Sequence, residues 1–150
     1  MVVRSAYCLF LFSLIRCFHY STSEQTVNAP VLLGIERIAS GHRLKVAAQN
    51  LEIGFAGYRL YEGASESEAR SLDAPTQKDC GPFGTLPAQG VEYAMDIRAD
   101  RTTVEDGSVN HLCVFTHAAT PGNYVVVRAL LLRDLQSQAT SIASNALIAP

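Results

Sequence analysis

The segment that decides the fold is LEIGFAGYRLYEGASESEAR, residues 51–70. Its centre, GYRLYEG, alternates: Tyr58 and Leu60 fall on one side of an extended chain, and Arg59 and Tyr61 fall on the other. Aromatic side chains on both faces are typical of a strand, because large rings pack against cross-strand neighbours. We therefore expect this segment to be a wall of a β-sandwich and not a reaction centre.

A short helix and a long loop are expected directly after this strand. Ser65 stands three residues before Glu68, which is the spacing of a helix-capping box. Residues 71–90 then contain three prolines and three glycines, and Cys80 lies in their middle. This composition predicts a loop rather than a regular element.

Other segments carry strand patterns of their own. In RLKVAAQN, for example, Leu44, Val46 and Ala48 share one face. The expected additional strands are 30–39, 43–50, 91–100, 111–118, 124–134 and 146–148, of which 124–134 is the most apolar. Asp106 and Gly107 form a hairpin signal. About seven short strands with one short helix predict an all-β sandwich over residues 30–150.

The first residues differ from the rest of the chain. Arg4 precedes an apolar run from Ala6 to Ile15, which is about half the length of a membrane-spanning helix. A basic start followed by a short apolar run predicts a secretory signal peptide over residues 1–16, with an amphipathic N-terminal segment as the alternative. Residues 21–29 are mostly polar and small. Residues 17–29 are therefore expected to form a flexible tether.

Two processing routes fit this terminus. Ser21 and Ser23 offer small residues to an ordinary signal peptidase. Alternatively, Leu14 three positions before Cys17 resembles a bacterial lipobox, which implies that Cys17 becomes the first mature residue and carries lipid. Arg16 departs from that pattern, because the residue before the cysteine is normally small.

Charge and cysteine content narrow the class of protein. Without residues 1–16 the chain keeps 12 − 2 = 10 basic and 14 acidic residues, a net charge of 10 − 14 = −4, and no basic cluster that suits nucleic acid. Cys80 and Cys113 remain in the body of the chain, 113 − 80 = 33 residues apart. In an oxidising compartment they are expected to form a disulfide, with two buried thiols as the alternative.

Several of these segments together resemble a fibronectin type III domain. FAGYRLYEG is similar to its C strand, and GNYVVVRALLLRDLQSQATSIASN to its F strand, F–G loop and G strand, while PVL and LKVAAQN fit strands A and B. The usual tryptophan is missing, and residues 64–90 are longer than in that family. With the lipobox-like start, the chain also resembles lipoproteins of spirochaetes. Such resemblance implies binding or spacing more often than catalysis.

Residues for metal or nucleophilic chemistry are few. His111, Cys113 and His117 would share one face of a strand, yet 111 and 117 would lie about 20 Å apart, too far for one ion. No G-x-S-x-G elbow occurs, and Asp96 and Asp100 are expected to be solvated. We therefore expect no catalytic residue, no metal and no cofactor.

These observations predict a non-catalytic interaction or structural domain that is exported, either to the bacterial cell envelope with a lipid anchor on Cys17 or as a secreted protein. A possible binding surface is Arg59 with Tyr61, which would point outward if Tyr58 points inward; a tyrosine pair that stiffens the sheet is the alternative. The partner would be a protein or a glycan, bound by sheet edges or by loops 64–90 and 134–141. Two other functions stay open: a small secreted hydrolase or metal enzyme using His111 or His117, and a carbohydrate-binding module using Tyr61 and Tyr93.

Overall fold

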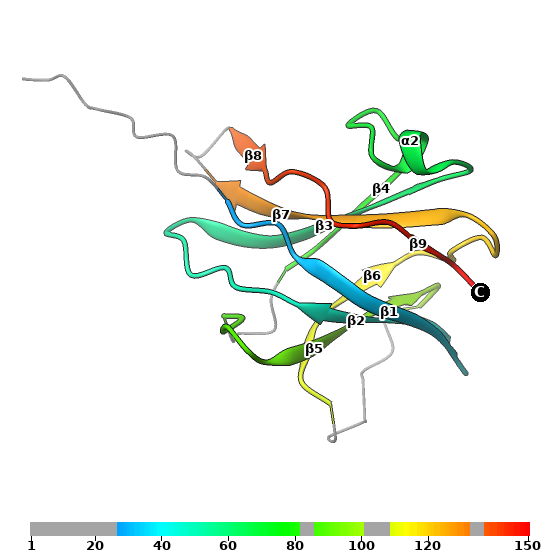
Figure 1. Ribbon diagram of the computed structural model, residues 1–150, viewed down its shortest axis with the longest axis horizontal. Coiled ribbons are helices and arrows are strands. Elements are labelled where there is room, and N and C mark those ends of the chain that lie inside the picture. The colour runs from blue at the N-terminus through cyan, green and yellow to red at the C-terminus, as the bar shows by residue number, and fades with distance from the viewer. Residues whose placement is uncertain (1–26, 82–85, 101–108, 133–136) are drawn as a thin grey trace, which may run out of the picture.

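The computed structural model describes residues 27–81, 86–100, 109–132 and 137–150, which form two β-sheets packed face to face (Figure 1). The elements of this described part are β1 (Val31–Ile38), β2 (Gly41–Ala47), β3 (Phe55–Gly63), α2 (Glu66–Ala69), β4 (Thr76–Cys80), β5 (Glu92–Arg98), β6 (His111–Thr116), β7 (Tyr124–Leu132), β8 (Gln138–Thr140) and β9 (Leu147–Ile148). The first sheet has the order β1-β2-β5-β6, and the second has the order β4-β3-β7-β8 with β9 also paired to β7. The predicted all-β sandwich is confirmed.

The core fills the space between the sheets with alternate residues of each strand. Leu44 and Val46 of β2 and Ile97 of β5 are fully buried from the first sheet. Tyr58 of β3 and Val127 of β7 meet them from the second sheet and are equally inaccessible to solvent. The residues of β2 and β3 that alternate onto one face in the sequence, such as Leu44 and Tyr58, are therefore the ones that face the core.

Two strands were not expected from the sequence. Residues 71–90 were expected to be a loop, yet Thr76–Cys80 forms β4 and pairs with β3. The prediction was wrong because β4 is an edge strand whose middle residues are polar and exposed, so it has no apolar alternation. The three-residue β8 was missed for the same reason, and the described part contains nine strands rather than seven.

The pairing of β5 with β6 is parallel. A hairpin joins antiparallel strands, so the hairpin signal of Asp106 and Gly107 does not link these two strands directly. Asp106 and Gly107 themselves lie outside the described residues.

An irregularity in β6 corrects a further expectation. Ala94 pairs with His111 and the next residue, Met95, pairs with Cys113, so Leu112 is an extra residue in a β-bulge. Leu112 and Cys113 are both buried in the core, and His111 is turned to the outer face of the sheet. The predicted common face of residues 111, 113, 115 and 117 was wrong because a bulge re-aims the side chain beside it.

The helix α2 begins as the sequence predicted. The Glu68 backbone N–H donates to Ser65 Oγ at 3.2 Å, and Glu68 Oε2 accepts from the Ala64 N–H at 2.7 Å. This reciprocal cap fixes the helix against the end of β3. A Cβ on Gly63 would lie 2.7 Å from the Ala69 backbone nitrogen, so a side chain there would push the helix away from the sheet.

The chain enters the fold before the predicted domain boundary at residue 30. Val27 packs against the core, and the Asn28 N–H donates to Glu52 Oε1 at 3.0 Å. Residues 27–29, which were expected to belong to the tether, are therefore part of the domain. Residues 1–16 and Cys17 lie outside the described residues. In the described ranges no helix has the length and apolar character needed to cross a membrane.

Candidate functional site

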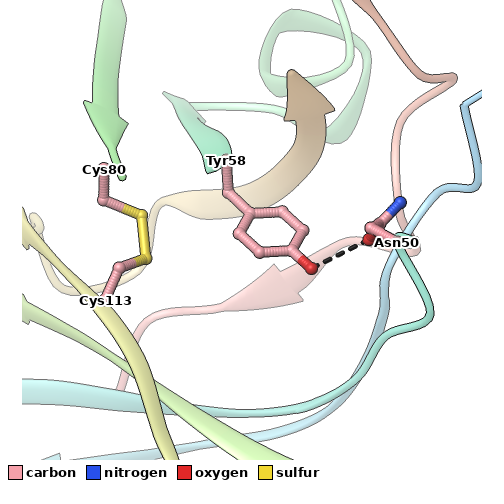
Figure 2. The surroundings of a disulfide bond; sticks show 4 residues. All are labelled: Asn50, Tyr58, Cys80 and Cys113. Carbon is pink, nitrogen blue, oxygen red and sulfur yellow. Dashed lines mark hydrogen bonds between the residues drawn. A yellow bond between two sulfur atoms is a disulfide. The ribbon is translucent and has the colours of Figure 1, made fainter. Parts of the chain in front are cut away.

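One flank of the sandwich is closed by a disulfide. Cys80 ends β4 and Cys113 lies in β6, so their bond joins the edge of one sheet to the edge of the other (Figure 2). The Cα atoms are 5.7 Å apart, and 6% and 1% of the two residues are exposed. The predicted pairing is present in the structure, and we call β4 and β6 with this bond the disulfide flank.

The backbone of β3 is shaped to receive Cys80. Ala56 is an extra residue in a bulge, and Gly57 after it has φ +120°, where a Cβ would lie 2.1 Å from the Cys80 carbonyl oxygen. Only glycine allows this approach. The neighbouring Tyr58 hydroxyl donates to Asn50 Oδ1 at 2.8 Å (Figure 2). Burial raises the pKa of Tyr58, and the nearby charge of Glu52 raises it further, so the hydroxyl remains a donor.

The opposite flank is closed by an amide. The Leu32 N–H donates to Asn145 Oδ1, and Asn145 Nδ2 donates to the Leu32 carbonyl oxygen, both at 2.8 Å. Leu32 stays paired with Val46 of β2, and β1 is the edge strand of its sheet, so the outward side of the Leu32 backbone is available to Asn145. The Asn145 side chain thus substitutes for a neighbouring strand, and we call β1 with the segment before β9 the amide flank.

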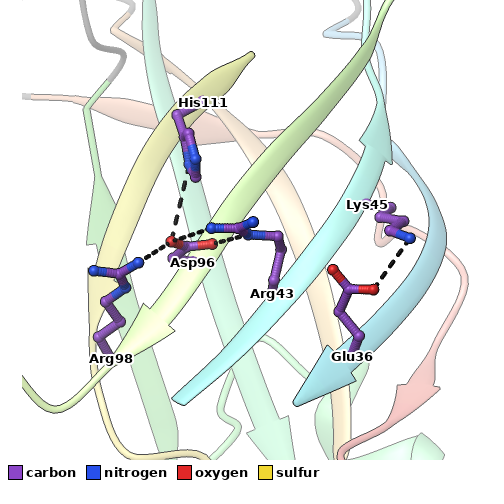
Figure 3. Close-up of polar contacts among 6 residues, drawn as sticks. All are labelled: Glu36, Arg43, Lys45, Asp96, Arg98 and His111. Carbon is purple, nitrogen blue, oxygen red and sulfur yellow. Dashed lines mark hydrogen bonds and ion pairs between the residues drawn. The ribbon is translucent and has the colours of Figure 1, made fainter. Parts of the chain in front are cut away.

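A buried carboxylate lies on the outer face of the first sheet (Figure 3). Asp96 is fully buried: Arg43 Nε donates to it at 2.9 Å, Arg98 Nη2 donates at 2.7 Å, and His111 Nδ1 lies 3.9 Å away. The expectation that Asp96 is solvated was wrong, because two guanidinium groups cover it. These contacts tie β2, β5 and β6 together across the sheet.

The ion pair beside this cluster has a different environment. Lys45 Nζ lies 3.1 Å from Glu36 Oε2, and both side chains are 46% exposed (Figure 3). Solvent screens such a pair, so its contribution to stability is small. Among the described residues, the outer face of the first sheet therefore carries a buried ion cluster centred on Asp96 and an exposed ion pair beside it.

A second buried carboxylate holds the crossover between the sheets. Glu62, near the end of β3, is 2% exposed; its Oε2 lies 2.5 Å from His117 Nε2, and its Oε1 accepts from the Thr120 N–H at 3.0 Å and from Asn123 Nδ2 at 2.7 Å. Burial alone would raise the pKa of Glu62, but the hydrogen bonds from His117, Thr120 and Asn123 outweigh it and lower this pKa. The carboxylate fixes the segment that leads from β6 into β7.

The two histidines singled out in the sequence do not converge. His111 lies beside Asp96 and His117 beside Glu62, while Cys113 is in the disulfide. Within the ranges that the structure describes, no group of three or more histidine, cysteine, aspartate or glutamate residues could hold a metal ion. A metal enzyme that uses both histidines would need them around one ion. In the structure they lie beside different carboxylates.

The predicted surface of Arg59 and Tyr61 is not exposed as expected. Tyr61 does lie on the outer face, but it is only 1% exposed because α2 and the following loop cover it. Arg128 stacks over its ring at 5.4 Å and donates to the carbonyl oxygens of Arg70 and Ser141. Tyr61 was predicted to point into solvent because the alternation does not reveal what packs on the outer face.

Arg59 is engaged by its neighbours. Its guanidinium binds both carboxylate oxygens of Asp79 on β4 and reaches Gln138 Oε1 on β8 at 3.2 Å. The hydrogen bond to Asp79 is the main reason that the pKa of Arg59 is raised. Arg59 therefore bridges three strands on the outer face.

The tyrosines proposed for sugar binding are also buried. Tyr93 is 8% exposed, and its hydroxyl oxygen accepts from the Ala88 N–H at 2.9 Å. With Tyr61 covered by α2, neither ring offers a flat platform to a sugar. The expectation of an aromatic surface at these two positions was wrong.

The end of the sandwich where the chain enters presents a different surface. Four aliphatic side chains are exposed there: Leu51, Ile53, Leu86 and Leu132. We call the surface that they form the loop end. A shallow hollow of ≈ 300 Å³ lies beside the entering chain. It is lined by small, apolar and amide side chains: Asn28, Ala29, Val31, Ala47, Ala48, Gln49, Gln89 and Gly90. Sequence reasoning missed the loop end, although Leu51 and Ile53 stand between the turn residues Asn50 and Gly54.

No protein-family model matches the chain, and neither a curated protein nor a solved structure matches it. Function is therefore inferred from the residues of this chain.

Proposed function

We propose that the protein is an exported, non-catalytic interaction or structural domain at the bacterial cell envelope, anchored by lipid on Cys17. The observation that carries the proposal is the disulfide flank, where Cys80 and Cys113 join the two sheets from buried positions. Disulfides persist in oxidising compartments and are rare where thiols are kept reduced. The short apolar run from Ala6 to Ile15 and the lipobox-like Leu14 supply the route of export.

The fibronectin type III resemblance is part of the proposal and has support in the strand order. The strands that resemble A and B, β1 and β2, are neighbours, and the strands that resemble C and F, β3 and β7, are neighbours. The C-terminal segment returns to β7 through β8 and β9, as a G strand would. The parallel strand β6 is a departure from the resemblance.

A non-catalytic role is supported by how the buried charges are used. Asp96 accepts hydrogen bonds from two arginines, and Glu62 is held by His117, Thr120 and Asn123. Groups held in this way stabilise the framework. A domain with a rigid framework suits a role as a spacer or as a platform for a protein or glycan partner.

The proposal is tested by the mass and location of the mature protein. The full chain is produced in a bacterium that processes lipoproteins, and the envelope fraction is analysed by intact mass spectrometry. We expect a chain that starts at Cys17, carries the mass of lipid chains and remains with the membrane. The Cys17→Ser variant should lose the lipid and leave the membrane, whereas the matched Cys8→Ser variant should behave as wild type. An unmodified chain that starts at Glu24 contradicts the anchor.

A further inference from the structure

The loop end concentrates exposed aliphatic side chains. In the described part nine large hydrophobic residues are exposed, and four of them belong to the loop end. Ile53 is 88% exposed, Leu51 is 60% exposed, and Leu86 and Leu132 are each 49% exposed. They come from the β2–β3 loop, the β4–β5 loop and the last residue of β7. Grouped exposed apolar side chains mark an interaction site more often than scattered ones do.

Backbone hydrogen bonds hold these segments together. The Asn50 N–H donates to the Pro87 carbonyl oxygen at 3.4 Å, which places the chain around Leu51 beside the chain around Leu86. The Leu132 N–H donates to the Gly54 carbonyl oxygen at 2.8 Å, which places the end of β7 beside Ile53. The loop end is therefore one fixed surface built from three separate segments.

Ile53 is presented at the tip of a closed turn. The Phe55 N–H donates to the Glu52 carbonyl oxygen at 3.0 Å, so Ile53 and Gly54 are the central residues of a β-turn. Gly54 has φ +88°, as the third residue of a type II turn requires. A turn fixed in this way holds an aliphatic side chain out in solvent, where burial by another phase would stabilise it.

The N-terminal segment joins the domain at this same end. The Asn28 N–H donates to Glu52 Oε1 and Asn28 Nδ2 donates to the Gln49 carbonyl oxygen, so the entering chain runs along the β2–β3 loop. The C-terminus lies at the opposite end of the sandwich (Figure 1). Val27 follows Cys17 by only 27 − 17 = 10 residue steps, a span of at most about 35 Å when extended. A lipid on Cys17 would hold the loop end close to the bilayer.

The β2–β3 loop at this end carries little charge. In residues 48–54 the single charged residue is Glu52, and its Oε1 already accepts from the Asn28 N–H and from Asn50 Nδ2. The mature chain has no basic cluster that would attract anionic headgroups. The surface therefore suits the boundary between headgroups and acyl chains of a bilayer through apolar contact rather than through attraction to headgroup charge.

We propose that the loop end docks on the membrane that carries the anchor, with Ile53 and Leu51 inserted among the lipid chains. This inference rests on the proposed lipid anchor at Cys17, because the anchor supplies the proximity that makes a small apolar contact effective. Docking fixes the orientation of the domain. The end with the C-terminus faces away from the membrane and remains open to a partner.

The test uses the absence of tryptophan from the sequence. Single tryptophans are introduced in the full lipid-modified chain as Ile53→Trp and, as the matched control at the opposite end, Ile148→Trp, which replaces another exposed isoleucine. Each protein is reconstituted in phosphatidylcholine vesicles with brominated acyl chains, which quench tryptophan on contact. We expect Ile53→Trp emission to shift to shorter wavelength and to lose intensity, and Ile148→Trp emission to change in neither respect. Added salt should leave the difference unchanged.

Three results overturn the inference in distinguishable ways. Equal quenching of Ile53→Trp and Ile148→Trp in vesicle-bound protein overturns docking and leaves the anchor intact. Failure of both proteins to float with the vesicles overturns the anchor and docking together. A shift of Ile53→Trp emission that grows with protein concentration in the absence of lipid shows that a second copy covers the loop end, which also overturns membrane docking.

Discussion

The two flanks of the sandwich are both held closed, one by a covalent bond and the other by hydrogen bonds. At the disulfide flank, a covalent bond between buried Cys80 and Cys113 joins β4 to β6. At the amide flank, the side-chain amide of the exposed Asn145 makes two hydrogen bonds with the backbone of Leu32. The covalent bond acts mainly by restricting the unfolded chain, whereas the amide acts in the folded state alone. The two flanks should therefore contribute unequally to stability.

The largest effect is expected from opening the disulfide flank. Replacing both cysteines, as Cys80→Ala with Cys113→Ala, should lower the free energy of unfolding by about 3–4 kcal/mol for a loop of this length. Urea unfolding of the full chain measures the change. Reduction of the wild-type disulfide is the matched control, since it breaks the bond without removing side-chain atoms. An unfolding midpoint that does not respond to reduction would contradict the assigned role of this flank.

The crossover that follows β6 should depend on Glu62. Glu62→Gln removes the charge that receives hydrogen bonds from His117, Thr120 and Asn123, and we expect a loss of about 2 kcal/mol near neutral pH because hydrogen bonds to a charged group are strong. The loss should be seen as a lower urea midpoint.

The effect of Glu62 should also depend on pH. Its pKa is lowered in the folded state from an ordinary value of 4.5, so the folded state binds fewer protons than the unfolded state at acid pH. The contribution is complete above pH 4.5 and is lost as pH falls through the folded-state pKa. The stabilities of the wild type and Glu62→Gln should converge on acidification. Parallel curves down to low pH would show that the carboxylate charge is not responsible.

The amide flank should respond more weakly. Asn145→Ala removes both hydrogen bonds to Leu32 and should cost about 1–2 kcal/mol. Amide hydrogen exchange gives a local readout, because the Leu32 N–H loses its acceptor and should exchange faster. Asn145→Asp keeps the acceptor and lacks the donor, so it should preserve more of the Leu32 protection. Unchanged exchange at Leu32 in the alanine variant would mean that β1 is held by its pairing with β2 alone.

The smallest effect is expected beside the disulfide, inside the core. Tyr58→Phe removes the hydroxyl that donates to Asn50 Oδ1 and should cost about 1 kcal/mol. A double-mutant cycle with Asn50→Ala isolates this bond from the other contacts of Asn50 with the entering chain. Additive losses would indicate that the hydroxyl contributes nothing through Asn50.

Strands with two-residue alternation could be predicted from the sequence, and polar edges could not. The inward residues of β2 and β3 were identified because apolar side chains alternate along these segments, as Leu44 and Tyr58 illustrate. In β4 the exposed residues Gln77, Lys78 and Asp79 carry no such pattern, and the strand exists because its backbone pairs with β3. Backbone pairing of this kind depends on which strands become neighbours.

The predictions about sites failed where an outer face is covered. Asp96 and Tyr61 were both assigned to outward faces correctly, but arginines cover the first and α2 covers the second. His111 was misplaced because the bulge at Leu112 depends on the parallel partner β5. The cysteine pairing was predictable, since only Cys80 and Cys113 remain in the body of the chain. The loop end could be recognised only from the three-dimensional structure, because its members come from three separate segments.

The most direct test of a sandwich closed by a disulfide, and of the export proposed for it, is peptide mapping without reduction. The full chain is recovered from the envelope of the producing bacterium with free thiols blocked at lysis, and is then digested with trypsin. The prediction is a linked pair of peptides, residues 79–98 and 102–128, that separates only after reduction. Recovery of both peptides unlinked, each with a blocked thiol, would contradict a disulfide at this flank and the exported compartment inferred from it.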